Sequence, residues 1–335
     1  MEYKTIRLKI KPTSPFKTKL QSDTIFGIFA WNYKYLYGNE KFKTFLSDFS
    51  NSPSIVFSDG FFEGYLPRPI LEPLRLDTVL ELISLRMGDE RNSSSDALNI
   101  LLKRIKKMET LPESLLLELL GSPLSEIKIF EALLSDKFPT DDEKSFQVVS
   151  LIKNTINRIT GIVEEGLYQS NEIFYNKNFV IYAKFNPEKL SLSEIEEIFK
   201  LIGDFGFGAD KSTGKGRFEL LEISEEFELK KFMDPELYGR KNTVISLSSA
   251  LIFEGSTELL YGKTFVKFGK LGGDKANVGM HFKNPLVLYK PGSTFKVSKA
   301  KHIYGNSTSE VFIDRVGVHS GFFIPLFFEY KGEEL

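Results

Sequence analysis

Alternation of apolar and polar residues opens the chain. In KTIRLKIK, residues 4–11, three aliphatic side chains fall on one face and the polar and charged side chains on the other. This period of two predicts a half-buried strand. Ser22 then predicts the start of a helix as its N-cap, with Asp23 favourable in the first turn and Gly38 as the stop. The chain is therefore expected to begin with a strand followed by a helix.

Helical periodicity dominates the stretch that follows. Leucine and isoleucine recur at helical spacing from about residue 77 to residue 134, with breaks at Gly88, Pro112 and Pro123. We interpret this stretch as a helical insertion, at about residues 70–140, on a β scaffold.

Strand character returns after the insertion. Segments rich in β-forming residues cover 145–152 and 172–185, and the polar stretch between them suits a β-hairpin or a projecting loop. Ser193 and Glu196 match a capping box, which predicts the start of a helix that ends at Gly203.

The order of these elements predicts the fold class. With a last strand at 217–223, the first part of the chain fits an α+β, ferredoxin-like βαββαβ module that carries an insertion. We assign residues 1–235 to this domain and the strand-rich, helix-poor residues 240–335 to a second, with the charged stretch 224–241 as the linker. We expect the first sheet to be built from strands near 3–11, 145–152, 172–185 and 217–223.

The composition excludes several classes of protein. Apolar residues make up 41% of the 335 residues, and 31 are Phe, which is ample material for a buried core. The chain has no apolar run of about 18 residues, so we expect no membrane span. It has no Cys and only three His, which leaves no thiolate or multi-His site. A cytoplasmic protein without metal or cofactor is the plain interpretation.

Charge is segregated along a chain whose net charge is only −1. Residues 261–302 carry nine Lys against one Asp, and the first 19 residues carry six basic residues against one Glu. Residues 109–143 reverse this balance, with nine acids against two Lys. Because phosphate binding needs local positive potential, the basic stretches suit a nucleic acid and the acidic helices suit a protein partner or solvent. Lys-rich strands with one solvated face would give the same pattern.

The segment GFGADKSTGKGRF, from Gly206 to Phe218, carries the strongest chemical signal. Its four glycines let backbone N–H groups approach phosphates, and its Lys and Arg side chains can neutralise them. It is not a Walker A loop, because Gly216 follows Lys215 where a Mg²⁺-binding hydroxyl is required. A plain turn between a helix and a strand is the structural alternative.

Four segments together resemble motifs of the RAMP superfamily, the repeat-associated proteins of CRISPR systems. The Gly-rich segment is similar to that family's glycine-rich loop. SDTIFG, residues 22–27, resembles the SDT-[LI]-FG opening of the first helix in the type III-A subunit that holds the crRNA 5′ tag. NTINRITG, residues 154–161, followed by EEGLY, resembles N-x-I-[ND]-R-x-T-G. SDGFF with LPRP matches a further pattern loosely, departing at Gly60 and Phe61.

This resemblance implies tandem ferredoxin-like (RRM-like) domains that grip the 5′ tag of crRNA without catalysing a reaction. It implies the large signalling and nuclease subunit and a RAMP backbone subunit as protein partners. A hairpin would meet target RNA near the 5′ end of the guide. Aromatic residues beside the basic segments suit stacking of single-stranded RNA bases. The candidate RNA-binding residues are Lys17, Lys19, Ser22, Arg158, Thr160, Gly206, Gly208, Lys211, Ser212, Thr213, Gly214, Lys215, Gly216, Arg217, Lys267, Lys270 and Lys275.

Two enzymes of the same superfamily and one non-binding protein are alternatives. A processing endoribonuclease would cleave crRNA precursors, usually through a His, and His319 is the nearest candidate. A backbone subunit would cleave target RNA with a loop Asp, for which Asp23 and Asp59 are nearest. A ligand-free scaffold would explain the acidic helices but not the Gly-rich segment. We assemble no complete catalytic set from these residues.

Overall fold

The computed structural model describes most of the chain as a mixed α+β protein, which confirms the predicted class. The helices are α1 (Ser22–Leu46), α2 (Leu76–Met87), α4 (Glu113–Leu120), α5 (Glu126–Leu134) and α6 (Leu192–Phe205), and 3-10 turns occur at η1 (Lys211–Thr213), η2 (Glu228–Met233) and η3 (Pro235–Arg240). The described residues are 2–87, 102–134, 145–157, 159–253, 255, 257–274, 282–312 and 317–332.

One antiparallel sheet forms the first half of the body. The central strand β1 (Lys4–Pro12) lies between β8 (Phe179–Phe185) and β9 (Phe218–Ser224), and β2 (Ile55–Phe57) and β3 (Phe61–Phe62) pair with the other side of β8. Along the chain, β1, β2, β8 and β9 are first to fourth, so their spatial order is 2-3-1-4. The alternation in residues 4–11 buries Ile6, Leu8 and Ile10 completely.

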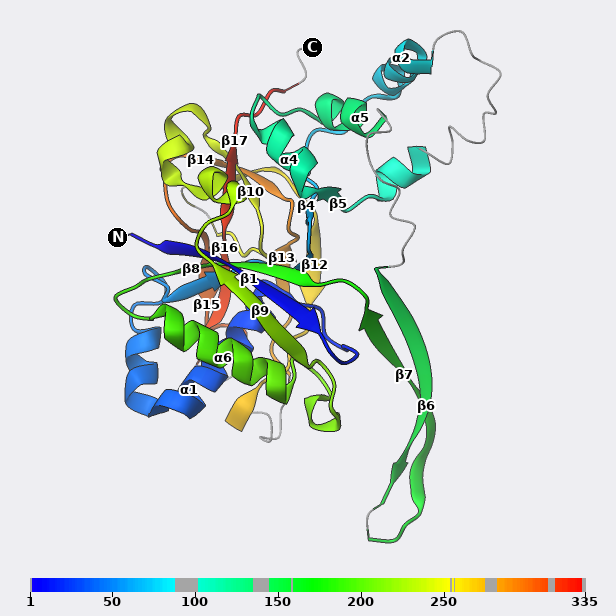
Figure 1. The fold of residues 1–335 in the computed structure, drawn as a ribbon, viewed down its shortest axis with the longest axis vertical. Helices are drawn as coiled ribbons and strands as arrows, with labels where there is room; N and C mark the ends of the chain where they lie inside the picture. The colour runs from blue at the N-terminus through cyan, green and yellow to red at the C-terminus, as the bar shows by residue number, and fades with distance from the viewer. Residues whose placement is uncertain are drawn as a thin grey trace.

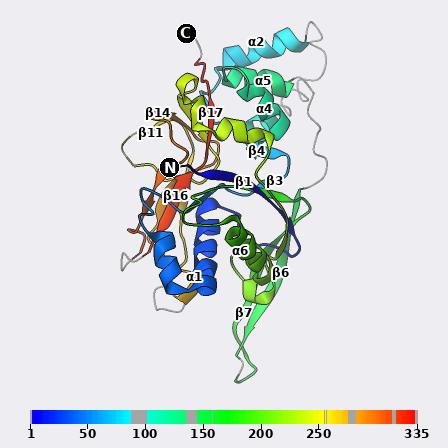
Figure 2. The same ribbon diagram turned by 60° about the vertical axis from the view of Figure 1, so that its left-hand side comes forward.

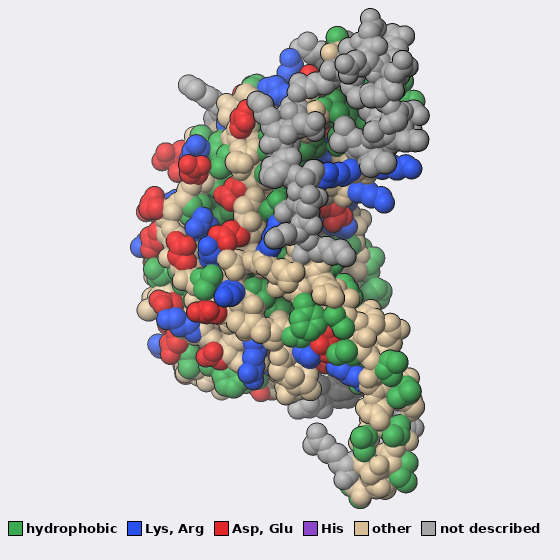
Figure 3. Space-filling view, turned by 45° about the vertical axis from the view of Figure 1, so that its right-hand side comes forward, with side chains coloured by type: hydrophobic (Ala, Val, Ile, Leu, Met, Phe, Trp, Pro, Cys, Tyr) green, Lys and Arg blue, Asp and Glu red, His purple; other side chains and the backbone are tan. Residues whose placement is uncertain are grey.

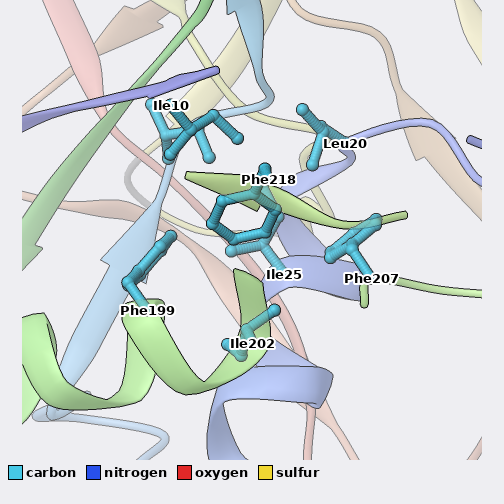
Figure 4. Close-up of a pocket in the computed structure, with 8 residues that line it drawn as sticks. Ile10, Leu20, Ile25, Phe199, Ile202, Phe207 and Phe218 are labelled. Atoms are coloured by element: carbon cyan, nitrogen blue, oxygen red, sulfur yellow. The ribbon is translucent and has the colours of Figure 1, made fainter. Parts of the chain in front are cut away.

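Helices α1 and α6 pack side by side against this sheet (Figures 1 and 2). Apolar side chains from both helices and from β1 and β9 point toward one another in the space between them (Figure 4). On α6 the buried residues recur at three and four positions, as expected for one apolar helix face. The labelled contacts include Ile10, Ile25, Phe199, Ile202 and Phe218 (Figure 4).

A second antiparallel sheet repeats the strand order of the first. It comprises β10 (Thr243–Ser246), β11 (Thr257–Tyr261), β14 (Thr294–Val297) and β17 (Pro325–Phe328), arranged as β11-β14-β10-β17 and therefore again 2-3-1-4. The described residues between 242 and 332 contain no α-helix. Instead, two strand pairs connect the sheet strands: β12 (Thr264–Lys267) with β13 (Leu286–Tyr289), and β15 (Tyr304–Thr308) with β16 (His319–Phe323).

The two sheets are not separate globules. Ile245, Leu247, Ile324 and Phe328 belong to the same buried cluster as the core of the first sheet. Strand β16 also packs against α1. The stretch 224–241 is packed rather than free, because Leu229, Phe232 and Met233 are buried. The division into domains 1–235 and 240–335 stays a prediction.

The described helices between residues 76 and 134 lie at one end of the body (Figure 1). They are α2, the helical residues 102–107, α4 and α5, and they follow β4 (Tyr65–Pro67), which pairs with β5 (Thr110–Pro112) in a separate two-stranded sheet. This agrees with the helical periodicity between 77 and 134.

The expected place of residues 145–152 in the first sheet is wrong. Strand β6 (Phe146–Ile156) pairs with β7 (Val163–Tyr175) alone, in a two-stranded hairpin that projects from the body (Figure 1). Neighbours along the chain close a hairpin through a short turn, and β8 is already flanked by β1 on one side and by β2 and β3 on the other. The expected hairpin between the two strand segments is confirmed.

Four predicted helix boundaries also need correction, one of them the end of α6, which continues past Gly203 to Phe205. Gln21, not Ser22, precedes α1, and the Ser22 side chain is buried rather than capping. Gly38 kinks α1 (φ 81°) without ending it, and the helix continues to Leu46. The capping box of α6 is formed by Ser191 and Glu194, two residues before the predicted pair. The same S-x-x-E pattern occurs at both places, and packing selects the earlier one.

Candidate nucleic-acid interface

The Gly-rich segment connects α6 to β9, as expected, and folds as a tight loop. Gly206, Gly208, Gly214 and Gly216 all have positive φ, and so does Asp210 (φ 58°). The loop closes on itself through the backbone, because the Phe207 N–H donates to Gly216 O at 2.8 Å. A β-carbon at Gly216 would lie 2.1 Å from Phe207 O, and one at Gly206 would lie 2.3 Å from Lys215 O.

Three of the four glycines therefore serve the protein's own packing. Gly208 belongs with Gly206 and Gly216, since its β-carbon would lie 2.4 Å from the Thr18 β-carbon. Gly214 differs, because nothing lies within 4 Å of the place where its β-carbon would be. Of the four, Gly214 is thus the position where a ligand can approach the backbone.

The loop packs against the turn that follows β1. Gly216 N–H donates to Pro15 O at 2.9 Å, and Arg217 N–H donates to the Ser14 hydroxyl at 2.8 Å. The same turn bonds to the base of the hairpin, where Phe16 and Ile173 exchange backbone hydrogen bonds of 2.8 and 2.9 Å. Segments far apart in the sequence therefore meet at one place.

The predicted cations of this region fall into two groups. The side chains of Lys19, Lys211 and Arg217 are exposed, as are Ser212 and Thr213. Lys17 instead contacts Asp210 at 2.7 Å, and Lys215 contacts Glu172 at 2.6 Å. A phosphate bound in this region would therefore lie near two kinds of cation: exposed side chains such as Lys211 and Arg217, and the ion-paired side chains of Lys17 and Lys215.

Sequence reasoning missed two residues of this region. Glu172 on β7 is buried, with 1% of its side chain exposed, and it accepts from Lys215 and, at 3.0 Å, from Lys153 on β6. Lys153 directly precedes the NTINRITG segment, which could have drawn attention to it. Nothing in the local sequence marks Glu172, because its partners are 19 and 43 residues away.

The start of α1 is a buried polar junction between the two sheets. Asp59 accepts from the N–H of Ser22 (3.0 Å) and of Ser249 (2.9 Å) through one carboxylate oxygen, and from the Ser249 hydroxyl (3.0 Å) through the other. Burial raises the pKa of Asp59 above its ordinary value. The hydrogen bonds from Ser22 and Ser249 lower this pKa, but their effect is smaller than that of burial. Ser22, a predicted RNA contact, is 4% exposed and bonds to Ser249 instead.

Lys267 is tied to the same helix start. Its ammonium donates to Asp23 at 2.5 Å, to Gln21 at 2.9 Å and to Thr24 at 2.7 Å. These internal partners explain its low exposure and do not favour its predicted role as a free phosphate contact. Nearby, Nε2 of His319 lies 3.7 Å from Asp23. Burial lowers the pKa of His319 to about 4, so its imidazole is neutral near pH 7.

Four predicted RNA contacts remain. Lys270 lies over the exposed ring of Phe282, with its ammonium 5.3 Å from the ring centre. Thr160 is exposed in the turn at the hairpin tip. Arg158 and Lys275 lie outside the described residues.

The hairpin itself is apolar to an unusual degree for a projecting element. Large apolar side chains are exposed along both strands and the turn, and Ile159 reaches 96% exposure. Figure 3 shows mostly hydrophobic and uncharged side chains on the hairpin, with charged ones where it joins the body. The most exposed of these apolar residues are Ile152, Ile159, Ile162 and Leu167. Such an arm suits an apolar protein surface or the face of a base better than a phosphate backbone.

The described residues hold neither a metal-binding cluster nor a membrane-spanning helix. No group of three or more His, Cys, Asp or Glu side chains in that part of the chain is arranged to hold a metal ion. None of its helices is both long and apolar enough to cross a membrane.

Comparison with known proteins gives consistent matches. The family model described as "RAMP superfamily" matches residues 16–219. A protein of Thermococcus onnurineus (strain NA1), described as "CRISPR system Cms protein Csm4", is 25% identical over 223 residues, which are 65% of this chain and 68% of that protein.

Solved structures give a fold comparison over nearly the whole chain. The Csm3–Csm4 subcomplex of a type III-A CRISPR-Cas interference complex contains a chain with a TM-score of 0.57 and 17% identity, covering 98% of this chain and 100% of that one. A chain of the Csm1–Csm4 cassette in complex with cA4 has a TM-score of 0.53 and 17% identity, covering 98% and 99%. These likenesses show the fold.

Proposed function

This chain belongs to the RAMP superfamily, and we propose that it is the non-catalytic subunit of a type III-A CRISPR effector complex that binds the 5′ tag of crRNA. The single observation that carries the proposal is the meeting of the Gly-rich loop, the turn after β1 and the hairpin base. Together they bring Lys17, Lys153, Lys211, Lys215 and Arg217 into one region from three separate segments. Such a region suits a single-stranded phosphate backbone.

The topology supports the proposed tandem ferredoxin-like arrangement. In both sheets four antiparallel strands follow the order 2-3-1-4, with β3 as an additional strand in the first, and the first sheet has a helix after its first and third strands. In the second sheet the strand pairs follow the second and third strands, so we interpret it as a degenerate copy in which β15 and β16 take the place of the second helix. Single-stranded RNA is commonly read by folds of this kind.

The relatives suggest the protein partners. The similar chains of solved structure occur in a Csm3–Csm4 subcomplex and in a Csm1–Csm4 cassette. By analogy we propose a RAMP backbone subunit and the large signalling and nuclease subunit as neighbours of this chain. The projecting hairpin would then reach target RNA near the 5′ end of the guide.

The absence of catalysis is part of the proposal. The three residues nearest to a catalytic role, Asp23, Asp59 and His319, are all buried, and Asp59 bonds only to backbone and serine groups that hold the two sheets together. A general base must reach the proton that it removes. Their burial favours a structural role for all three.

The test is a set of loop variants of the full chain. Lys211→Ala, Lys215→Ala and Arg217→Ala should each weaken binding of co-purified crRNA, whatever the tag sequence. Each should also lower the slope of log affinity against log salt by about 0.7, the value for one phosphate contact on a single strand. The proposal fails if the folded triple variant binds crRNA with unchanged affinity and unchanged salt slope. Cleavage of a repeat RNA that is lost in His319→Ala would favour the processing endoribonuclease.

A further inference from the structure

The buried carboxylate of Glu172 holds two lysine side chains in place. Its Oε2 accepts from Lys215 at 2.6 Å and its Oε1 from Lys153 at 3.0 Å. The hydrogen bond from Lys215 and then that from Lys153 hold the pKa of Glu172 below its ordinary value, although burial opposes them. Glu172 is therefore ionised at neutral pH, and each lysine gains a fixed rotamer from it.

The two lysines come from elements that no local sequence pattern connects. Lys153 is on the first strand of the hairpin, and Lys215 is in the Gly-rich loop. Their side chains remain 29% and 19% exposed, whereas Glu172 beneath them is 1% exposed. A lysine ammonium has three donors, and one described bond to Glu172 uses one of them. Each ammonium is thus held from below and still has donors for a ligand.

A further ion pair adjoins this arrangement. Lys17 bonds to Asp210, whose pKa is lowered first by that hydrogen bond and also by the charges of Lys153 and Lys215. The three ammonium groups and two carboxylates leave a local balance of +1. A site with one excess positive charge favours an anion with a single negative charge, and each phosphodiester of RNA carries one such charge.

An aromatic side chain lies next to the lysine pair. Tyr168 is the cross-strand partner of Lys153, and this residue is 48% exposed. Because side chains alternate along a strand, Tyr168 and Glu172 project from the same face of the hairpin. A phosphate held by the lysines would therefore bring a neighbouring base within reach of a ring on which it can stack.

We propose that Lys153 and Lys215, positioned by Glu172, form a binding site for one phosphodiester of single-stranded RNA at the hairpin base. This inference rests on the proposed RNA-binding function and adds a defined contact point to it. The competing explanation is an ion-pair network that only fastens the hairpin to the loop. The two explanations make different predictions: only the binding site requires that one particular RNA phosphate bind to the two lysines.

The experiment locates that phosphate chemically. The RNA that co-purifies with the full chain is sequenced and resynthesised with a single uncharged methylphosphonate linkage, moved along the strand one position at a time. With the wild-type chain, one position should lower affinity about tenfold, as expected for loss of a hydrogen-bonded charge. In Lys153→Ala and in Lys215→Ala the same position should lose most of this effect, because the phosphate no longer has its partner.

Two further variants test the positioning and serve as the control. Glu172→Gln keeps both lysines but removes the charge that positions them. The protein should remain folded, and the loss of affinity should no longer be confined to one methylphosphonate position but should extend to neighbouring positions. Lys200→Ala removes an exposed lysine on α6, paired with Glu196, and should leave the effect unchanged.

The outcomes separate the two proposals. If no RNA co-purifies and none binds, the proposed function fails. If RNA binds but every methylphosphonate position behaves alike in wild type, Lys153→Ala and Lys215→Ala, the site at Glu172 is overturned while RNA binding stands. If Glu172→Gln leaves the single sensitive position unchanged, its role in positioning the lysines is overturned.

Discussion

The carboxylate of Asp59 accepts a hydrogen bond of 2.9 Å from the backbone N–H of Ser249, 190 residues away. Asp59 follows an edge strand of the first sheet, and Ser249 follows the first strand of the second sheet. The same carboxylate oxygen accepts from Ser22 at the start of α1. One buried side chain thus fixes the two sheets and the first helix relative to one another.

Asp59→Ala should therefore destabilise the whole body. The change leaves the buried Ser22 N–H and the buried Ser249 hydroxyl without their acceptor, at a cost of about 3 kcal/mol in the free energy of unfolding. Urea denaturation of the full chain measures it. Glu40→Ala, which removes an exposed partner of Lys43, is the control and should change stability by less than about 0.5 kcal/mol. Equal effects of the two changes would contradict the role given to Asp59.

His319 should make stability depend on pH in the acid range. Burial lowers its pKa in the folded protein to about 4 from an ordinary value of about 6.5, so the folded state favours the neutral imidazole. Its contribution is complete above the unfolded pKa and is lost as pH falls from about 6.5 to about 4, by about 3 kcal/mol. Asp23 opposes this shift, whereas Lys267 and Lys283 add to it.

The difference between wild type and His319→Gln isolates this effect. Glutamine does not titrate, so the stability of the variant relative to wild type should rise as pH is lowered from 7 to 4. Denaturant unfolding at a series of pH values measures the change. A constant difference across this range would show that His319 has no shifted pKa.

Gly216 and Gly214 should respond differently to substitution by alanine. At Gly216 the new β-carbon would meet Phe207 O, so we expect loss of loop structure and a lower unfolding free energy. At Gly214 there is open space, and only the positive φ costs about 1 kcal/mol. Thermal unfolding and crRNA affinity, measured together, distinguish the two. If RNA approaches the backbone at Gly214, this variant should lose affinity while it remains folded.

Exposed apolar residues of the hairpin should matter for assembly and not for folding. Ile159→Ser and Leu167→Ser replace side chains that are 96% and 74% exposed, so unfolding of the isolated chain should change by less than about 0.5 kcal/mol. Recovery of the complex by co-purification should fall if the arm contacts a partner or a base. Val56→Ser, at a buried position, is the contrasting control and should impair folding itself.

The sequence by itself determined the features that depend on neighbouring residues. The alternation in residues 4–11 determined a strand with one buried face, and the polar stretch after Ile152 indicated a β-hairpin or a projecting loop, of which the structure forms the hairpin. The position of the Gly-rich loop between a helix and a strand also followed from local pattern, as did the motifs that resemble the RAMP superfamily. Each of these depends on periodicity or on backbone freedom over a few residues.

Tertiary structure alone decided which of several equivalent sequence patterns forms a helix cap, and which partner each polar side chain binds. Ser191 and Ser193 both begin an S-x-x-E pattern, and the packing of the apolar face of α6 selected Ser191. Ser22 was a plausible cap by sequence, but contact with Ser249 buried it. Lys215 was a plausible free cation until the fold placed Glu172 beneath it. Such partners lie dozens or hundreds of residues apart, and no periodicity carries that information, because only folding brings the two charges or the donor and acceptor within bonding distance.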